Sequence, residues 1–261
     1  MLNRLKKRRY SFTNAQKEWQ NVPVDDIGYF NSKDLLALND KEFLKIINAS
    51  IQNRYSTNNY RNYGNKWKIY SGVETTKGKI IMDFGCGTGI ESLQFAKNGN
   101  SVIIADINPY NLQVAHRLLK LHGFTPHEVI QITESNPFFT LETTKIDIFY
   151  ANGVLHHTPY IREILSRALT ILSDDGIARL MLYSDRGYLK YIDSDLPDFT
   201  QDIKECKNFK KMYTHFDSVG KYADWYSEKK IAYRVTGLYK VRNFNYATDD
   251  DRFCFVDLEK L

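Results

Sequence analysis

A glycine-rich turn is the first place in this sequence where residue types and spacing could do chemistry. The stretch "IIMDFGCGTGIESLQFAKNG" has glycines at positions 85, 87 and 89, with Asp83 just before them. Glycine allows a sharp turn with positive φ and lets a ligand approach without a Cβ in the way. Between a strand and a helix, such a turn presents free backbone N–H groups to a ligand. It could also be a tight connection that binds nothing.

A carboxylate follows at the end of the next apolar run. Asp106 closes "SVIIAD", one helical pattern after the glycines. In the dinucleotide fingerprint G-x-G-x-x-G, an acid at a comparable place accepts hydrogen bonds from a ribose diol. The spacing here is G-x-G-x-G, which disfavours a nicotinamide-dependent oxidoreductase. Asp106 could instead be a turn residue or helix N-cap before Asn108-Pro109, but the glycine turn upstream favours the ribose.

Hydrophobic periodicity indicates the elements that must position these residues. From residue 79 onward, short runs rich in Ile and Val alternate with helical patterns, which predicts a parallel sheet with helices on both faces. Two final runs separated by "DDD" predict an antiparallel hairpin that closes the sheet. We therefore expect an α/β fold with a doubly wound, mostly parallel, seven-stranded sheet. The predicted strands before the hairpin are 79–84, 101–107, 128–133, 146–152 and 176–184, and the predicted helices between them are 90–99, 109–123 and 161–172.

The two flanks of this pattern differ from it. Residues 1–78 hold many aromatic and polar residues without strand alternation, and they predict an N-terminal helical cap that contributes to a substrate region. A helical insertion is expected at about 185–235. Within it, Tyr222, Trp225 and Tyr226 follow a helical i, i+3, i+4 spacing. This stripe could pack on the sheet as core, or it could form a substrate wall.

Composition limits the class of protein. Apolar residues are 43% and charged residues 26% of the 261, as in ordinary globular proteins. No run approaches the roughly 18 apolar residues of a membrane span, and the basic N-terminus lacks the apolar core of a signal peptide. The three cysteines form no C-x-x-C pair, which argues against a disulfide framework or a structural zinc site. We expect a cytoplasmic protein with no structural metal and no integral membrane association.

The net charge of +5 comes from one end of the chain. Five basic residues supply it, and the remaining basic and acidic residues balance. A basic tail could contact anionic lipid or nucleic acid, or it could be a solvated, frayed terminus. The five residues are Arg4, Lys6, Lys7, Arg8 and Arg9.

Four motifs in order resemble those of class I S-adenosylmethionine-dependent methyltransferases. They are "DFGCGTG", "VIIADINP", "DIFYANGVLHHTP" and "ALTILSDDGIARLMLY", and the third resembles the small-molecule branch of that family. The resemblance covers about residues 75–184. When the closing hairpin is included, it extends to most of residues 75–261. Relatives often have a leucine-proline-glycine-glycine turn where this chain has "SDDG". The resemblance implies a Rossmann-like methyltransferase domain over residues 79–261.

The resemblance also implies a set of residues that contact S-adenosyl-L-methionine. The glycine turn would line its amino-acid end by main chain, with Asp83 beneath the amino group. Asp106 would hold the ribose hydroxyls, and Ile107 would pack on the adenine. Asn152 would lie near the transferable methyl group, and Glu134, or else Thr133 or Ser135, near the adenine amino group. The implied set is Asp83, Gly85, Cys86, Gly87, Gly89, Asp106, Ile107, Glu134 and Asn152.

Methyl transfer from a sulfonium is an in-line displacement whose leaving group is a neutral thioether, so no acid is needed. Positioning can contribute about 7–11 kcal/mol of the rate enhancement. A base matters only for a hydroxyl or ammonium acceptor. His156 and His157 follow the fourth strand, and either imidazole could take a proton near neutral pH. Alternatively, His156 caps or packs the next helix and His157 faces solvent.

The sequence thus predicts a methyltransferase for a small or medium-sized acceptor of natural-product or saccharide type, with Trp225 and Tyr226 as substrate-binding residues. A nucleic-acid enzyme is disfavoured: the chain lacks an [N/D]-P-P-[Y/F] tetrad after strand four and a Pro-Cys dipeptide, and its body is neutral. A protein methyltransferase is another alternative. A sensor or scaffold that binds S-adenosylmethionine without turnover is an alternative of another class. The oligomeric state is left open.

Overall fold

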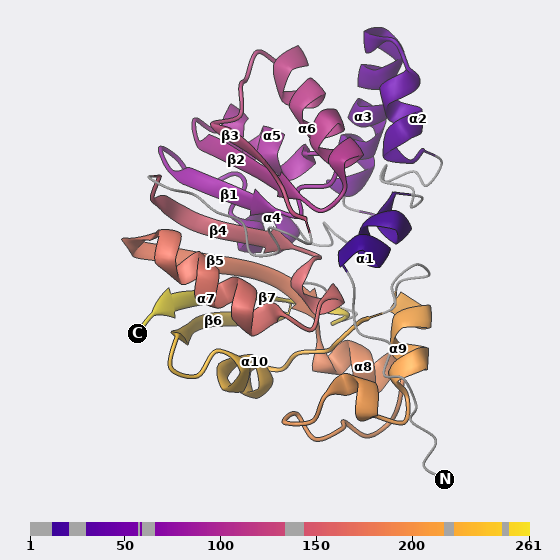
Figure 1. Cartoon of the computed structure of the whole chain (residues 1–261), viewed down its shortest axis with the longest axis vertical. Coiled ribbons are helices and arrows are strands. Elements are labelled where there is room, and N and C mark those ends of the chain that lie inside the picture. Colours follow the sequence, from indigo (N-terminus) through magenta and orange to yellow (C-terminus); the bar gives the residue numbers. More distant parts are fainter. Residues whose placement is uncertain are drawn as a thin grey trace.

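The computed structural model describes residues 12–20, 30–56, 58, 66–133, 144–216, 222–246 and 251–261. Within these residues, seven strands form one sheet in the order β3-β2-β1-β4-β5-β7-β6 (Figure 1). The first five strands are parallel, and β7 runs antiparallel to both β5 and β6. The predicted fold class is confirmed. The strands are β1 (Ile80–Phe84), β2 (Ser101–Asp106), β3 (Glu128–Gln131), β4 (Ile146–Asn152), β5 (Leu172–Tyr183), β6 (Tyr239–Tyr246) and β7 (Phe253–Lys260).

Helices cover both faces of the sheet because each central strand is apolar on both sides. On β1, Ile81 belongs to one buried cluster and Met82 to the cluster on the opposite face. The Ile81 face is covered by α2 (Ser32–Ala37), α3 (Asp40–Arg54), α5 (Ile90–Lys97) and α6 (Pro109–Leu121). The Met82 face is covered by α7 (Ile161–Ile171) and α10 (Glu228–Arg234).

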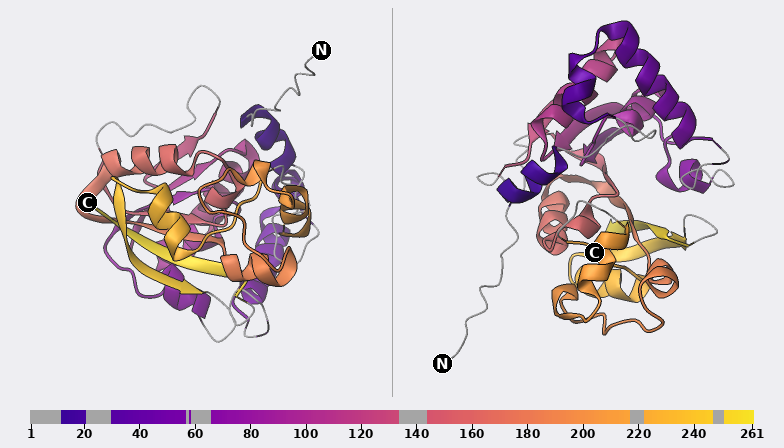
Figure 2. Two further views of the ribbon diagram at one scale, coloured as in Figure 1. Left: turned by 90° about the horizontal axis from the view of Figure 1, so that it is seen from below. Right: turned by 90° about the vertical axis from the view of Figure 1, so that its right-hand side faces the viewer.

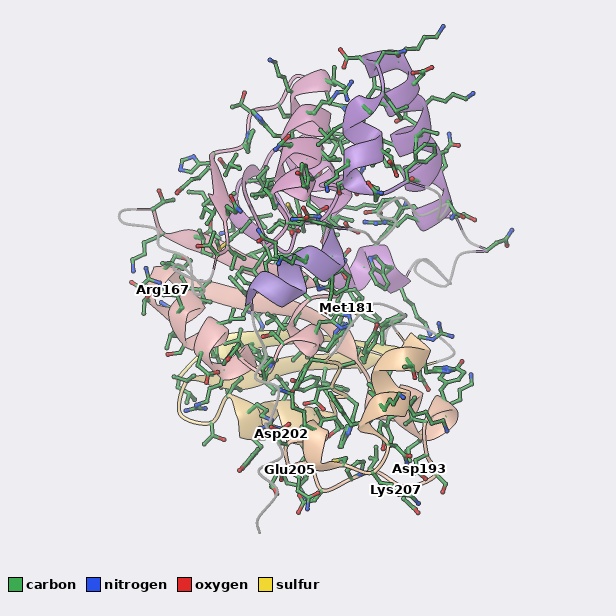
Figure 3. All side chains as sticks on the ribbon, turned by 45° about the vertical axis from the view of Figure 1, so that its right-hand side comes forward. Arg167, Met181, Asp193, Asp202, Glu205 and Lys207 are labelled. Carbon is green, nitrogen blue, oxygen red and sulfur yellow. The ribbon has the colours of Figure 1, made fainter. Side chains whose placement is uncertain are left out.

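A third buried cluster lies over β5 and β7. It joins Met181 and Phe255 of the sheet to Trp67 of α4 (Lys66–Ser71) and to the accessory segment, defined as residues 185–216 and 222–227. This segment includes α8 (Asp185–Tyr191), η3 (Ile203–Glu205) and α9 (Phe209–Phe216). Figure 2 shows it as a lobe beside the yellow β6–β7 hairpin. In Figure 3, Met181 lies in the middle of the molecule, whereas the labelled charged residues of the lobe lie at its outer end.

Two local predictions are wrong. The predicted turn at 173–176 lies inside β5, where the pairing register jumps from Ile146↔Leu172 to Ile148↔Ile177. The predicted helical stripe at Tyr222–Tyr226 is extended chain: Tyr226 bridges to Ser184, and its N–H donates to the Tyr183 carbonyl at 2.8 Å. Pairing with the end of β5 therefore overrides the helical periodicity, and α10 begins only after its N-cap Ser227.

The N-terminal helix α1 (Phe12–Trp19) lies at the carboxyl edge of the parallel strands. The Gln16 amide donates to the Ile107 carbonyl at 2.9 Å, and Asn108 Nδ2 donates to the Trp19 carbonyl at 3.3 Å. α1 therefore contacts the end of β2, the region where parallel α/β sheets bind ligands. Among the helices in the described residues, none has the length and hydropathy needed to cross a membrane.

Candidate functional site

The three glycines of the β1–α5 turn all have positive φ, of 79°, 54° and 77°. A Cβ on Gly85 would lie 2.2 Å from Val154 Cγ2, and a Cβ on Gly89 would lie 2.7 Å from the Cβ of Ala115. Among the described residues, nothing lies within 4 Å of the place a Cβ on Gly87 would take. Gly85 and Gly89 are thus required by packing inside the protein. Gly87 differs because it faces open space, as expected where a ligand approaches the backbone.

Asp106 ends β2 and is held from several sides. Its Oδ2 accepts the N–H of Gly87 at 2.9 Å, and its Oδ1 accepts the N–H of Asn108 at 2.7 Å and Nδ2 of Asn111 at 3.2 Å. Burial raises the pKa of Asp106, and these hydrogen bonds oppose that rise. The N-cap of α6 is Asn108, not Asp106. A carboxylate oxygen can accept two hydrogen bonds, so Oδ2 retains capacity for one more donor.

Asp83 lies beneath the turn and is buried. It accepts a short hydrogen bond from the Ser92 hydroxyl of α5. Burial raises its pKa to about 7, while the Ser92 hydrogen bond lowers it and the charge of Glu91 raises it. Near neutral pH this carboxyl therefore exchanges its proton readily, and a cation above it would favour the charged form.

The raised pKa of Asp83 gives a pH-dependent stability. Its folded pKa of about 7 lies above 3.8, the ordinary pKa of an exposed aspartate, so the unliganded protein loses stability as pH rises between these values. Asp83→Asn removes that loss and is expected to stabilise the unliganded protein by at most about 4 kcal/mol above pH 7. The gain should shrink as pH falls towards 3.8. Urea unfolding of both proteins across this range measures it, and a gain independent of pH would contradict the burial of a titrating carboxyl.

Two charged residues that sequence reasoning missed lie beside Asp83. Arg54, in the last turn of α3, forms a short buried ion pair with Oε2 of Glu91, in the first turn of α5. Within the described residues, the buried Oε1 of Glu91 has no hydrogen-bond partner. An orphaned buried carboxylate oxygen is costly unless a ligand or water satisfies it. The pair joins segments 37 residues apart, so no local pattern could have revealed it.

Three further residues expected near the cofactor lie at the carboxyl ends of β1, β2 and β4. Cys86 is buried, and burial raises the pKa of its thiol well above the ordinary value, which leaves it protonated. Ile107 is partly buried and packs against the core cluster. Asn152 ends β4, and its Nδ2 donates to the Tyr150 hydroxyl at 2.9 Å. Glu134 lies outside the described residues.

The two histidines of η2 (Leu155–His157) have different surroundings. His156 is buried; its Nδ1 accepts the N–H of Tyr183 at 3.3 Å, and its ring centroid lies 3.8 Å from that of Tyr183. Burial lowers the pKa of His156 well below 6.5. His157 is less buried, and its ring lies edge-on to Trp19 of α1 at 5.3 Å. The geometry favours His156 as a structural group and leaves His157 available for chemistry.

Trp225 and Tyr226 point to opposite sides of their extended segment. Trp225 belongs to the third cluster and Tyr226 to the core cluster on the Met82 face. Both are at most 2% exposed. The Lys230 ammonium lies 4.0 Å from the centroid of the Trp225 ring, and it pairs with Asp224 at 2.7 Å. In the described part of the chain, Trp225 Nε1 has no hydrogen-bond partner. The substrate-binding role of this pair remains a prediction.

Residues 82–178 match the family described as methyltransferase domain. The matched part of the chain begins within β1 and ends within β5. A curated relative, protein arginine N-methyltransferase 1 of Saccharomyces cerevisiae (strain ATCC 204508 / S288c), is 32% identical over 97 residues, 37% of this chain. The match spans about a quarter of that relative, 24% of its length.

Solved structures share the fold of the methyltransferase domain. A S-adenosylmethionine-dependent methyltransferase from Clostridium acetobutylicum ATCC 824 aligns with TM-score 0.54 and 11% identity, over 81% of this chain and 97% of that one. One from Aquifex aeolicus aligns with TM-score 0.52 and 12% identity, over 89% and 100%. Magnesium protoporphyrin IX methyltransferase from Synechocystis PCC 6803, with bound SAM, aligns with TM-score 0.51 and 13% identity, over 86% and 99%.

The magnesium protoporphyrin IX methyltransferase structure holds SAM, and the residues present in this chain fit that cofactor. The open space above Gly87 lets the cofactor reach the backbone, and the spare capacity of Asp106 Oδ2 suits a ribose hydroxyl. The buried, unpartnered Oε1 of Glu91 suits the cofactor's ammonium group, and Arg54 beside it suits the carboxylate.

Proposed function

We propose that this protein transfers a methyl group from S-adenosylmethionine to a small or medium-sized acceptor, of natural-product or saccharide type. The observation that carries the proposal is Gly87, whose N–H donates to Asp106 and whose missing Cβ leaves open space among the described residues at the carboxyl edge. Bound there, the cofactor supplies an electrophilic methyl group. The protein's part is to bind the cofactor at its two polar ends and to hold the acceptor in line with the methyl group.

The acceptor side is formed by segments that surround this edge. The accessory segment brings aromatic side chains to β5, and α1 places Trp19 against His157. Rigid aromatic side chains bind small molecules with little loss of conformational entropy. The aromatic environment and the third motif, "GVLHH", support an enzyme of the small-molecule branch.

A protein acceptor is the rival within enzymes, since the curated relative is named as a protein arginine methyltransferase. Recognition of a guanidinium calls for carboxylates that pair with it. The segment that follows β4, residues 153–160, reads "GVLHHTPY" and contains no acid. Its histidines suit a neutral, protic acceptor better than an arginine. A sensor that binds the cofactor without turnover is the rival of another class.

The test is incubation of the purified protein with methyl-labelled S-adenosylmethionine and three kinds of probe: p-nitrophenol, methyl glucoside and an arginine-containing peptide. Mass spectrometry of each probe should show the gain of one methylene mass on a hydroxyl probe. Methylation of the peptide alone would support the protein-acceptor alternative. Tight cofactor binding without label transfer to any probe would contradict the proposed enzyme and favour the sensor.

Cofactor affinity is expected to depend on Asp106. Asp106→Ala should weaken binding of S-adenosylmethionine at least tenfold, because a hydrogen bond to a charged group contributes about 1.5–3 kcal/mol. Calorimetry on the folded variant measures this. Asp147→Ala is the matched control: its Oδ2 also accepts a backbone N–H, from Ile80 at 2.8 Å, but at the opposite edge of the sheet. Equal affinities in the two variants would contradict the ribose assignment.

A further inference from the structure

Glu91, in the first turn of α5, has one buried carboxylate oxygen with spare hydrogen-bonding capacity. The residue is 6% exposed, and its Oε1 has no hydrogen-bond partner within the described residues. Its other oxygen, Oε2, pairs with the Arg54 guanidinium of α3. A buried carboxylate oxygen without a donor is costly in free energy. Oε1 therefore keeps its full capacity to accept hydrogen bonds from a ligand.

The neighbours of Glu91 lie where the strand order of the sheet reverses. Burial raises the pKa of Asp83 in β1 and of Tyr150 in β4, and the nearby charge of Glu91 raises both pKa values further. Asp83 and Tyr150 are partners in the β1–β4 pairing. From this pair the sheet continues through β2 and β3 on one side and through β5 on the other. Parallel α/β sheets bind ligands at such a point, beyond the carboxyl ends of the strands. Glu91 is therefore close to the place where a fold of this kind binds its ligand.

The balance of charges in this buried group favours a cationic ligand. Within the described residues, two carboxyls, of Asp83 and Glu91, lie near one guanidinium, that of Arg54. After burial, repulsion by Glu91 contributes to the raised pKa of Asp83. A ligand cation beside Oε1 would offset this negative charge, and an ammonium would also supply hydrogen-bond donors. The α-ammonium group of S-adenosylmethionine has both properties.

We infer that Oε1 of Glu91 binds the α-ammonium group of S-adenosylmethionine; the inference rests on the cofactor binding of the proposed function. The family resemblance implies Asp83 at this ammonium, but Asp83 already accepts the Ser92 hydroxyl. Oε1 of Glu91 has all of its acceptor positions unused within the described residues. Arg54 is a positioning residue, because its pair with Oε2 holds the carboxylate of Glu91 in place.

This assignment makes the ammonium of the ligand a requirement for tight binding. An adenine nucleoside that keeps the ribose and the thioether but lacks the ammonium can still bind at Asp106 and Gly87. Such a ligand leaves Oε1 of Glu91 buried without a donor, which costs free energy. Glu91 should therefore discriminate S-adenosylmethionine and its product from 5′-methylthioadenosine and related nucleosides.

The test is calorimetry with four ligands that differ at the amino-acid end. S-adenosylhomocysteine has both charged groups, and S-adenosyl-3-thiopropylamine has only the ammonium. S-adenosyl-4-thiobutyric acid has only the carboxylate, and 5′-methylthioadenosine has neither. Glu91→Gln should weaken binding of the two ammonium ligands at least tenfold, the scale of a hydrogen bond to a charged group. The other two ligands should bind within about twofold of their affinity for the parent protein, because they make no contact that the substitution removes.

Two further variants serve as comparisons. Asp83→Asn tests the rival anchor and should preserve the preference for ammonium ligands. Asp257→Asn is the matched control, because it removes a carboxylate that also holds a guanidinium, that of Arg179 at 2.7 Å, but on β7. It should bind all four ligands like the parent protein. If Glu91→Gln does not fold, the double variant with Arg54→Met replaces it, since neither partner of the pair is then left buried alone. In that variant S-adenosyl-3-thiopropylamine should lose affinity and 5′-methylthioadenosine should not.

Binding needs no turnover, so these measurements separate the assignment of Glu91 from the proposed function. Equal losses for all four ligands, or a loss confined to the two carboxylate ligands, would overturn the assignment. An ammonium-selective loss in Asp83→Asn that equals or exceeds the loss in Glu91→Gln would also overturn it. A protein that shows the expected binding pattern and methylates no probe would contradict the proposed function and leave the assignment standing. A protein that binds none of the four ligands would contradict both.

Discussion

Gly87→Val is expected to abolish binding of S-adenosylmethionine, with at least a 100-fold loss of affinity, while the sheet stays folded. Gly87 has a φ of 54°, and no atom of the described residues lies within 4 Å of the place its Cβ would take, so a Cβ there would meet no described part of the unliganded structure. It would instead occupy the space of the cofactor. The backbone strain of a left-handed conformation costs about 1–2 kcal/mol, too little to unfold an average domain. Calorimetry and circular dichroism on the same sample measure both effects.

Gly99→Val is the matched control for this experiment. Gly99 also has positive φ, of 82°, and in the part of the chain that the structure describes a Cβ there would also meet nothing within 4 Å. It follows α5 at the opposite edge of the sheet, so the variant should carry similar strain and bind the cofactor normally. If both variants lose affinity equally, strain rather than cofactor approach explains the loss, and the glycine turn is not the site.

Trp225→Ala is expected to lower the free energy of unfolding by roughly 3–5 kcal/mol, because it empties the space of a tryptophan that is 2% exposed. It also removes the aromatic face beside the buried Lys230 ammonium. For a chain of this size the melting temperature should fall by roughly 10 °C. Thermal unfolding measures the loss, and a stability within about 0.5 kcal/mol of the parent would contradict the packing of Trp225 as core.

Trp225→Phe separates a core role from a substrate role. It keeps most of the ring volume and removes Nε1, the buried donor that has no partner within the described residues. If Trp225 is only core, Trp225→Phe should keep the parent's methyl transfer per folded molecule. A selective fall in kcat/KM at unchanged cofactor affinity would assign Nε1 to the acceptor.

The sequence by itself determined the sheet and the position of the glycine turn and Asp106, which we propose as the cofactor end of the site. Alternating apolar and helical runs from residue 79 predicted the five parallel strands and the closing hairpin, because burial on both faces requires that pattern. The glycine turn and Asp106 could be located for a related reason. A β–α turn and the end of the next strand lie at the same edge of a parallel sheet, so their position follows from local pattern alone.

Only the tertiary structure decided what depends on contacts between distant segments. The helical spacing at Tyr222–Tyr226 was overridden because backbone pairing with β5 gave that segment other partners. Likewise, the spacing of "DFGCGTG" could not tell that Gly85 and Gly89 are needed for packing and Gly87 for open space.

The same limit applies to the charged and titratable groups. Arg54 and Glu91 lie on helices from different parts of the chain and form an ion pair. The adjacent histidines His156 and His157 look alike in sequence but differ in burial. Burial and hydrogen-bond partners set which group is charged and which nitrogen is free. Burial and hydrogen-bond partners depend on contacts between distant segments, so they cannot be read from the residues that are neighbours in the sequence.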